Sequence, residues 1–238
     1  MALSVKRPST FQQYKTLLIK DLRQEFHTKE MLTSMGIYAF LVLVVFGASL
    51  AQTGNSFDVL QMSGGLFWTL IVFTSLLGLN RSFSHEKENG CLEGILLVPL
   101  DRSVVFLAKA TSNLLFLLAV EIVALPLFYF FFLTTTTPAE TFSMVLLPLL
   151  AGTIGVAGIG TLLSTITINT RGKDVMLAVL FIPLIYPLLY ACVSASTVAI
   201  VGSQIFADIY YPALLLAVGY DFIMLLLSWV LYDFVISA

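Results

Sequence analysis

The stretch VLQMSGGLFWTLIVFTSLLGL, residues 59–79, contains no charged side chain. A helix of about 20 apolar residues crosses a hydrocarbon core about 30 Å thick, so this stretch is long enough to span a membrane. Five other segments share its length and largely apolar character. The six expected spans are residues 33–51, 59–79, 104–133, 141–168, 175–199 and 212–236. Because each is continuously apolar rather than alternating, the pattern predicts a helical bundle and not a β-barrel.

The composition of the whole chain also predicts an all-α membrane protein. Hydrophobic residues make up 58% of the 238 residues and charged residues only 11%, whereas soluble domains carry about 25% charged residues. The even spread of the apolar segments predicts a single transmembrane domain over residues 1–238. No basic stripe interleaved with aromatic residues occurs, which argues against nucleic acid as a partner.

The positive charges all fall on one side of a six-span topology. Since cytoplasmic loops carry an excess of Lys and Arg, that side is predicted to be cytoplasmic, and both termini with it. The 12 cations precede the first span or lie in or beside the second and fourth connections: Lys6, Arg7, Lys15, Lys20, Arg23, Lys29, Arg81, Lys87, Arg102, Lys109, Arg171 and Lys173.

Residues 1–32 are expected to be cytoplasmic and to contain an amphipathic helix in the membrane interface. Ser9 and Gln12 fit a capping box at its start. Apolar residues follow at spacings of three and four: Phe11, Tyr14, Leu18, Leu22 and Phe26. Such a face binds lipid at the headgroup level, while cations on the opposite face meet anionic lipids. A topogenic anchor and a contact with a partner protein are equal interpretations of this helix.

The second connection, SHEKENGCLEGILLVPLDRS at residues 84–103, is longer than a link between two helices requires, since about 2–8 residues suffice. Leu92, Ile95 and Leu96 form an apolar patch at helical spacing, and Glu88 and Glu93 flank it. A short helix with one apolar face and carboxylates beside it is typical of a contact with another protein.

The run E-x-x-x-G-x-L-E-G-I-L-L-x-P-L-D-R-S-x-x-F-L-A-K, from Glu86 to Lys109, resembles the corresponding loop of the cytochrome c maturation B (CcmB) family. Members of that family are ABC-2-type permease subunits of an ATP-binding-cassette complex often called the haem exporter. The resemblance covers the whole chain: six spans, a basic amphipathic N-terminus, and Arg171 with Pro183 and Pro187. Parts of the motif recur in other ABC-2 permeases, but the LEGILLxPLDR core favours CcmB.

The resemblance implies that the loop is a coupling helix, which docks on a cytoplasmic ATPase subunit of the CcmA kind. Its implied contacts are Glu88, Leu92, Glu93, Ile95 and Leu96. The resemblance also implies a permease homodimer in a bacterial cytoplasmic membrane or a related organelle. The implied partners are CcmC-like and CcmD-like membrane subunits and a CcmE-like haem chaperone, which the ATP-driven step would release from the CcmC-like subunit.

The chain itself carries no visible catalytic constellation. The P-loop motif GxxxxGK[ST] is absent, so ATP would bind a separate subunit. His27 and His85 are interpreted as surface residues, because a metal site usually combines several ligands. Cys91 and Cys192 form neither a CxxC nor a CxxCH motif. We therefore expect a non-catalytic subunit without a metal, and the sequence does not show that the chain binds haem.

Two carboxylates, Glu121 and Asp221, fall near the middle of expected spans. A charge at that depth costs several kcal/mol, so each side chain should face the bundle interior or be protonated. One interpretation is a shared intramembrane polar site. The other, equally weighted, is a structural hydrogen bond to a hydroxyl such as that of Ser112, Ser228 or Tyr220.

Small residues and prolines indicate how the spans pack. Gly152, Gly155, Gly158 and Gly160 lie in the fourth span, where they favour close helix packing, within the bundle or across a permease dimer, over a gating hinge. The stretch FIPLIYPLLY in the fifth span is expected to bend or unwind at its two prolines. Residues 194–211 are expected to form an outer loop with a short re-entrant helix.

Rival functions stay open from the sequence. An ABC-2 permease for a lipid, polysaccharide or drug would carry similar spans and a similar loop. A proton-coupled secondary transporter would use Glu121 and Asp221 as proton-binding carboxylates. An intramembrane enzyme is disfavoured, because no pairing of a nucleophile with a base is visible.

Overall fold

The structure is a computed structural model that describes residues 9–53, 59–88, 101–133, 138–168, 170, 172–202 and 206–235. Seven helices lie within these ranges. They are α1 (Thr10–Thr28), α2 (Glu30–Thr53), α3 (Val59–Glu88), α5 (Arg102–Phe132), α6 (Pro138–Thr167), α7 (Lys173–Val201) and α8 (Phe206–Val235).

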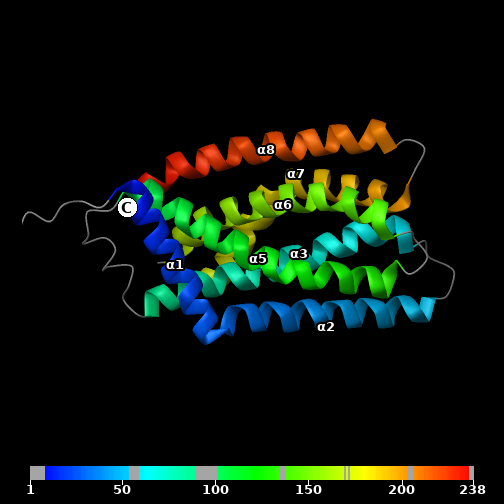
Figure 1. Ribbon diagram of the computed structural model, residues 1–238, viewed down its shortest axis with the longest axis horizontal. Helices are drawn as coiled ribbons and strands as arrows, with labels where there is room; N and C mark the ends of the chain where they lie inside the picture. The colour runs from blue at the N-terminus through cyan, green and yellow to red at the C-terminus, as the bar shows by residue number, and fades with distance from the viewer. Residues whose placement is uncertain are drawn as a thin grey trace, which may run out of the picture.

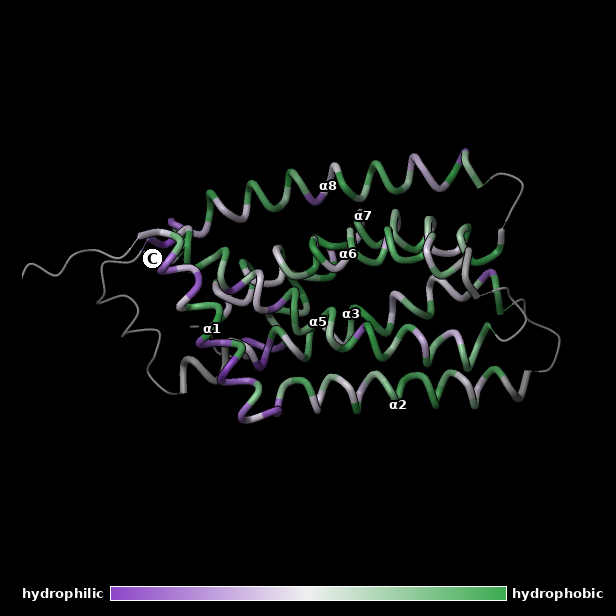
Figure 2. Tube along the Cα trace, viewed as in Figure 1, coloured by the Kyte–Doolittle hydropathy of each residue, from purple (hydrophilic) through white to green (hydrophobic). Residues whose placement is uncertain are grey.

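Six of these helices, α2 to α8, are long and apolar enough to cross a membrane. They run side by side along the long axis of the molecule (Figure 1). Hydrophobic residues line their length, and hydrophilic residues are concentrated at the end where α1 lies (Figure 2). The prediction of an all-α membrane protein with six spans is confirmed.

Every expected span overlaps one of the six long helices, but the helices extend beyond the apolar segments. The clearest case is α3, which continues to Glu88 although the apolar segment ends at residue 79. Hydropathy marks only the part of a helix that needs lipid around it. A helix continues through polar residues as long as its backbone hydrogen bonds are made, so the sequence pattern underestimates its length.

The expected outer loop at residues 194–211, with its re-entrant helix, is wrong. Helix α7 continues to Val201, and α8 begins at Phe206. Ala195, Ser196 and Ala199 are buried small residues of α7, which pack the helix end into the bundle. Gly202 then ends the helix in a left-handed conformation with φ of 64°, which glycine adopts at little cost.

The prolines do not interrupt the helices that contain them. The fifth span was expected to bend or to unwind at these residues. Unwinding is wrong, because α7 is continuous through Pro183 and Pro187, whereas a bend stays a prediction. A proline removes one backbone donor, so the carbonyl four residues earlier, that of Pro183 in the case of Pro187, loses its usual partner. The hydroxyl of Tyr220 in α8 donates to the carbonyl oxygen of Leu184, next to the freed carbonyl. A side chain of a neighbouring helix therefore bonds the backbone beside the proline, as is common in membranes.

Helix α6 packs against α3, α5, α7 and α8, and its glycines make these contacts close. A methyl group added at Gly152 would overlap the indole ring of Trp68 in α3. A methyl group added at Gly155 would overlap Asp221 in α8 and Leu188 in α7. The interpretation of these small residues as packing positions within the bundle is confirmed.

Helix α1 crosses one end of the bundle at a steep angle to the long helices (Figure 1). The predicted capping box is present: the Ser9 hydroxyl accepts from the backbone N–H of Gln12, and the Gln12 side chain accepts from the backbone N–H of Ser9. Lys29 ends α1 in a left-handed conformation with φ of 52°, and α2 begins at the next residue. The chain therefore turns sharply from α1 into the first span.

Candidate functional site

The candidate site is the end of the bundle at which α1 lies, where α3 ends at Glu88 and α5 begins at Arg102; we call it the α1 end. Of the expected coupling residues, Leu92, Glu93, Ile95 and Leu96 lie outside the described residues. Glu88 is described only as the last helical residue of α3. The structure describes the helices on either side of the segment 89–100 and the contacts that join these helices to α1 and α2.

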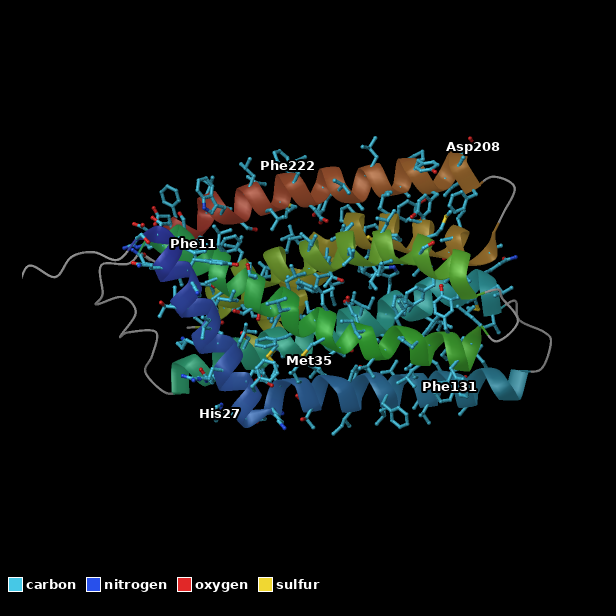
Figure 3. All side chains as sticks on the ribbon, in the orientation of Figure 1. Phe11, His27, Met35, Phe131, Asp208 and Phe222 are labelled. Carbon is cyan, nitrogen blue, oxygen red and sulfur yellow. The ribbon has the colours of Figure 1, made fainter. Side chains whose placement is uncertain are left out.

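Helix α1 presents three different faces rather than two. Phe11, Ile19 and Phe26 point away from the bundle, with exposed fractions of 72%, 47% and 66%. Figure 3 labels Phe11 and His27 near the two ends of the helix. The other expected apolar residues, Tyr14, Leu18 and Leu22, are half-buried. The expected apolar face therefore divides between the outside and the edge of the bundle.

The face of α1 that contacts the bundle is polar, which the sequence analysis missed. Its buried residues are Gln13, Asp21 and Glu25. With Leu17, these residues recur every four positions and so follow one side of the helix. The spacing of four positions could be recognised in the sequence. The partners of Gln13 and Asp21 could not, because they lie at the start of α5 and within it, far along the chain.

Opposite Asp21 lies Lys109, in the third turn of α5. The Lys109 Nζ atom is 3.0 Å from Asp21 Oδ2, and the two side chains are only 7% and 8% exposed. The Ser112 hydroxyl donates to the same carboxylate oxygen at 3.3 Å, and Lys20 Nζ lies 3.3 Å from Oδ1. Because removal of one partner from a buried pair costs about 3–5 kcal/mol, the arrangement fixes α1 against α5.

Two more hydrogen bonds join α1 to α5, one before the start of α5 and one beside Lys109. The side-chain oxygen of Gln13 accepts from the backbone N–H of Asp101 at 3.1 Å. The Tyr14 hydroxyl donates to the Thr111 hydroxyl at 3.1 Å. Asp101 directly precedes α5 and is the first described residue after the segment 89–100. The position at which the chain enters α5 is therefore attached to α1.

Two contacts near the start of α2 join this helix to α1 and to α3. The Glu25 carboxylate accepts from the backbone N–H of Leu32 at 2.8 Å, which satisfies a free donor in the first turn of α2. Arg81, near the end of α3, pairs with Glu30 at the start of α2. This second pair is largely exposed, and exposed ion pairs contribute little stability. It nevertheless shows that α2 and α3 meet at the α1 end.

The two expected intramembrane carboxylates are both buried, with exposed fractions of 4% for Glu121 and 5% for Asp221. The Thr153 hydroxyl lies 2.9 Å from both Glu121 carboxylate oxygens. Asp221 lies against Gly155, and its Oδ1 atom has no hydrogen-bond partner among the described residues. Both carboxylates therefore adjoin α6 two positions apart, but no contact joins them.

The hydroxyl partners that we expected for these carboxylates are wrong. Ser112 donates to Asp21, and Tyr220 donates to the Leu184 carbonyl. The Ser228 hydroxyl has no partner within the part of the chain that the structure describes. The hydroxyl interpretation is correct in kind for Glu121, since Thr153 supplies the bond. Thr153 was overlooked because it lies 32 positions away on another helix.

Among the described residues, no group of three or more His, Cys, Asp and Glu side chains is placed to hold a metal ion. His27 is exposed, and its Nδ1 atom lies 2.9 Å from the Arg23 carbonyl oxygen of the same helix. Cys192 is a buried free thiol. The polar groups of the α1 end are thus arranged as ion pairs and hydrogen bonds between helices.

Six long apolar helices with an N-terminal helix across one end define a multi-pass helical membrane protein. The family described as CcmB protein matches residues 12–228, from α1 into α8, and the chain belongs to this family. Heme exporter protein B of Pseudomonas aeruginosa is 27% identical over 177 residues, which cover 74% of this chain and 77% of the relative.

Two further relatives carry the same name. Heme exporter protein B of Bradyrhizobium diazoefficiens is 30% identical over 176 residues, which cover 72% of this chain and 76% of the relative. Heme exporter protein B of Rhodobacter capsulatus is 26% identical over 179 residues, which cover 74% of this chain and 78% of the relative. The similarity therefore extends over most of the bundle rather than over one motif.

Proposed function

We propose that this chain is the transmembrane permease subunit of an ABC complex that acts in cytochrome c maturation, by haem export or by release of a haem chaperone. The observation that carries the proposal is the CcmB family match from residue 12 to residue 228. The printed name of the relatives, heme exporter protein B, supports haem as the cargo of the complex. The chain would catalyse no covalent reaction itself.

ATP would be hydrolysed by a separate cytoplasmic subunit of the CcmA kind. We place its docking surface on the segment between α3 and α5, with contacts from Glu88, Leu92, Glu93, Ile95 and Leu96. The contacts at the α1 end support this placement, because both ends of the segment lie where hydrogen bonds and ion pairs join α1, α2, α3 and α5. A push on the segment would therefore act on several helices together.

The complex would contain two copies of this permease, two ATPase subunits, and CcmC-like and CcmD-like membrane subunits. A CcmE-like haem chaperone would be its client on the outer side. The complex would lie in the bacterial inner membrane, with both termini of this chain in the cytoplasm. The distribution of the 12 lysines and arginines supports that orientation.

Co-purification from the native membrane in mild detergent tests the proposal. We expect a P-loop ATPase and haem-handling subunits to accompany the unmodified chain. The double substitution Glu93→Lys and Leu96→Asp should abolish ATPase recovery, because it removes one carboxylate and part of the apolar patch. Asp208→Lys, an exposed charge reversal at the opposite end of the bundle, is the matched control and should leave recovery unchanged.

Three results would count against parts of this proposal. If no ATPase accompanies the unmodified chain under conditions that preserve related complexes, the permease proposal fails. If an ATPase is recovered equally with the double variant, the docking surface lies elsewhere. If the ATPase is recovered without haem-handling subunits, an ABC-2 permease for another substrate replaces the cytochrome c proposal.

A proton-coupled secondary transporter is the second candidate, and one observation favours it. Glu121 and Asp221 are both buried within the bundle, where ionisable groups commonly mark ion pathways. Transport by such a protein would survive depletion of ATP and would collapse with the proton gradient. Transport by an ABC permease would stop when ATP is depleted and would continue without the proton gradient.

A further inference from the structure

We infer that the buried pair Asp21–Lys109 makes α1 and the start of α5 a single mechanical unit, so that α1 is part of the path between the ATPase and the spans. This inference rests on the proposed function and adds to it two positioning residues outside the segment 89–100. Both act through the helices that they join and touch neither ATP nor cargo.

The Asp21 carboxylate is buried, and both of its oxygens have close partners. Lys109 and Ser112 of α5 both reach its Oδ2 atom, at 3.0 Å and 3.3 Å, and Lys20 reaches Oδ1 at 3.3 Å. Charges that leave water must be compensated by close partners with good geometry. Separation of α1 from α5 would take from Lys109 the carboxylate that compensates its charge, so the two helices are expected to stay together.

Polar contacts between α1 and α5 are spread along both helices. Within the described residues they include Gln13 to the backbone of Asp101, Tyr14 to Thr111, and Asp21 to Lys109 with Ser112. They are spread over two turns of α1 and about three turns of α5. A single contact leaves a hinge, whereas several separated contacts fix both distance and orientation. The two helices should consequently move as one body.

The junction between α1 and α5 begins directly after the segment 89–100. The segment 89–100 enters α5 at Asp101, and the Asp101 backbone N–H is itself bonded to α1. Lys109 follows about two turns further along, roughly 10 Å into the helix at 1.5 Å per residue. A displacement of the segment would reach the junction before it reaches the middle of α5, because the junction lies in the first three turns of that helix. Helix α1 would then carry the motion across the α1 end to α2, through Glu25 and Leu32.

Lys109→Met is the variant that tests this inference. It removes the link to α5 but leaves Asp21 paired with Lys20, so no buried charge is left without a partner. Lys109→Arg keeps the charge and is the conservative variant. Arg102→Met is the matched control. The Arg102 side chain lies at the same end and reaches Asp233 of α8, 3.8 Å from its carboxylate and 3.1 Å from its backbone carbonyl, but the two side chains are 43% and 64% exposed. Exposed pairs of this kind contribute little.

Three quantities are measured for each variant in a strain that depends on it: the amount of assembled complex, ATP hydrolysis per complex, and mature cytochrome c per complex. For Lys109→Met we expect at least a tenfold loss of cytochrome c per complex, with ATP hydrolysis per complex within twofold of the unmodified chain. Lys109→Arg should restore most of the yield, and Arg102→Met should behave as the unmodified chain does.

Two outcomes overturn the inference while the proposed function stands. One is an unchanged yield of cytochrome c per complex in Lys109→Met. The other is a loss of the complex itself, with the yield per remaining complex unchanged or with no complex left, which assigns the pair a purely structural role. If the unmodified chain supports neither ATPase recovery nor cytochrome c formation, the proposed function fails, and the inference fails with it.

Discussion

At the scale of single residues, Gly152 is one of the positions in the bundle that require a small side chain. The Trp68 ring that covers it is 1% exposed and is held by a hydrogen bond from Nε1 to the Ser196 hydroxyl at 3.0 Å. The ring therefore has little freedom to withdraw. We expect Gly152→Ala to lower the free energy of unfolding by about 1–3 kcal/mol, as overpacked cores usually do.

Thermal unfolding of the purified chain in detergent checks this prediction. Gly219→Ala is the control, because a methyl group at Gly219 meets nothing within 4 Å. The control should be neutral or slightly stabilising, since alanine is the better helix former by about 1 kcal/mol. Equal melting of both variants would show that α6 can move away from α3 at no cost.

Glu121 and Asp221 differ at this scale, although the sequence treats them alike. The Glu121 carboxylate has a donor in Thr153, so a structural role accounts for its presence. The Oδ1 atom of Asp221 is buried against Gly155 without a partner among the described residues. Buried polar groups are rarely left unsatisfied in native proteins. Of the two, Asp221 is therefore the residue whose presence packing does not explain.

At the scale of elements, α1 shows what local sequence determines. The capping box of Ser9 and Gln12 and the start of the helix followed from residues three positions apart, and the structure contains both. The pairing of Asp21 with Lys109 did not follow, because the two residues lie 88 positions apart and meet only when the bundle forms. The expected loop at residues 194–211 was wrong for a similar reason, since the end of α7 at Val201 and the start of α8 at Phe206 depend on packing rather than hydropathy.

The exposed face of α1 carries a prediction about its depth in the membrane. Ile19 is 47% exposed beside Phe11 and Phe26, whereas Gln24 follows five positions later, about 140° around the helix, and is half-buried. If α1 lies in the interface, a fluorescent probe on Ile19→Cys should be quenched by brominated lipid at least twice as strongly as one on Gln24→Cys. Both variants are prepared with Cys91 and Cys192 replaced by alanine. Equal quenching at the two positions would mean that α1 is lifted from the lipid.

At the scale of the whole molecule, the six spans were predictable because lipid imposes one requirement on every span. About 20 apolar residues and a complete set of internal hydrogen bonds are needed wherever the chain crosses. The arrangement of the spans around α6 was less predictable. It depends on which small residues of α6 meet Trp68, Asp221 and Leu188, and these contacts join three different helices.

Orientation is also a property of the whole molecule, and the charge distribution predicts it. All 12 lysines and arginines lie in or beside three parts of the chain: the part before α2, the segment between α3 and α5, and the segment between α6 and α7. A cation near an anionic cytoplasmic leaflet contributes about 1 kcal/mol, so the opposite orientation would be strongly disfavoured.

In a chain without native cysteines, Thr170→Cys should react with a membrane-impermeant maleimide only in inside-out vesicles. Ser56→Cys, between α2 and α3, should react only in right-side-out vesicles. The reverse pattern would place the α1 end outside the cell, where no cytoplasmic ATPase could reach the segment 89–100, and would remove the physical basis of the permease proposal.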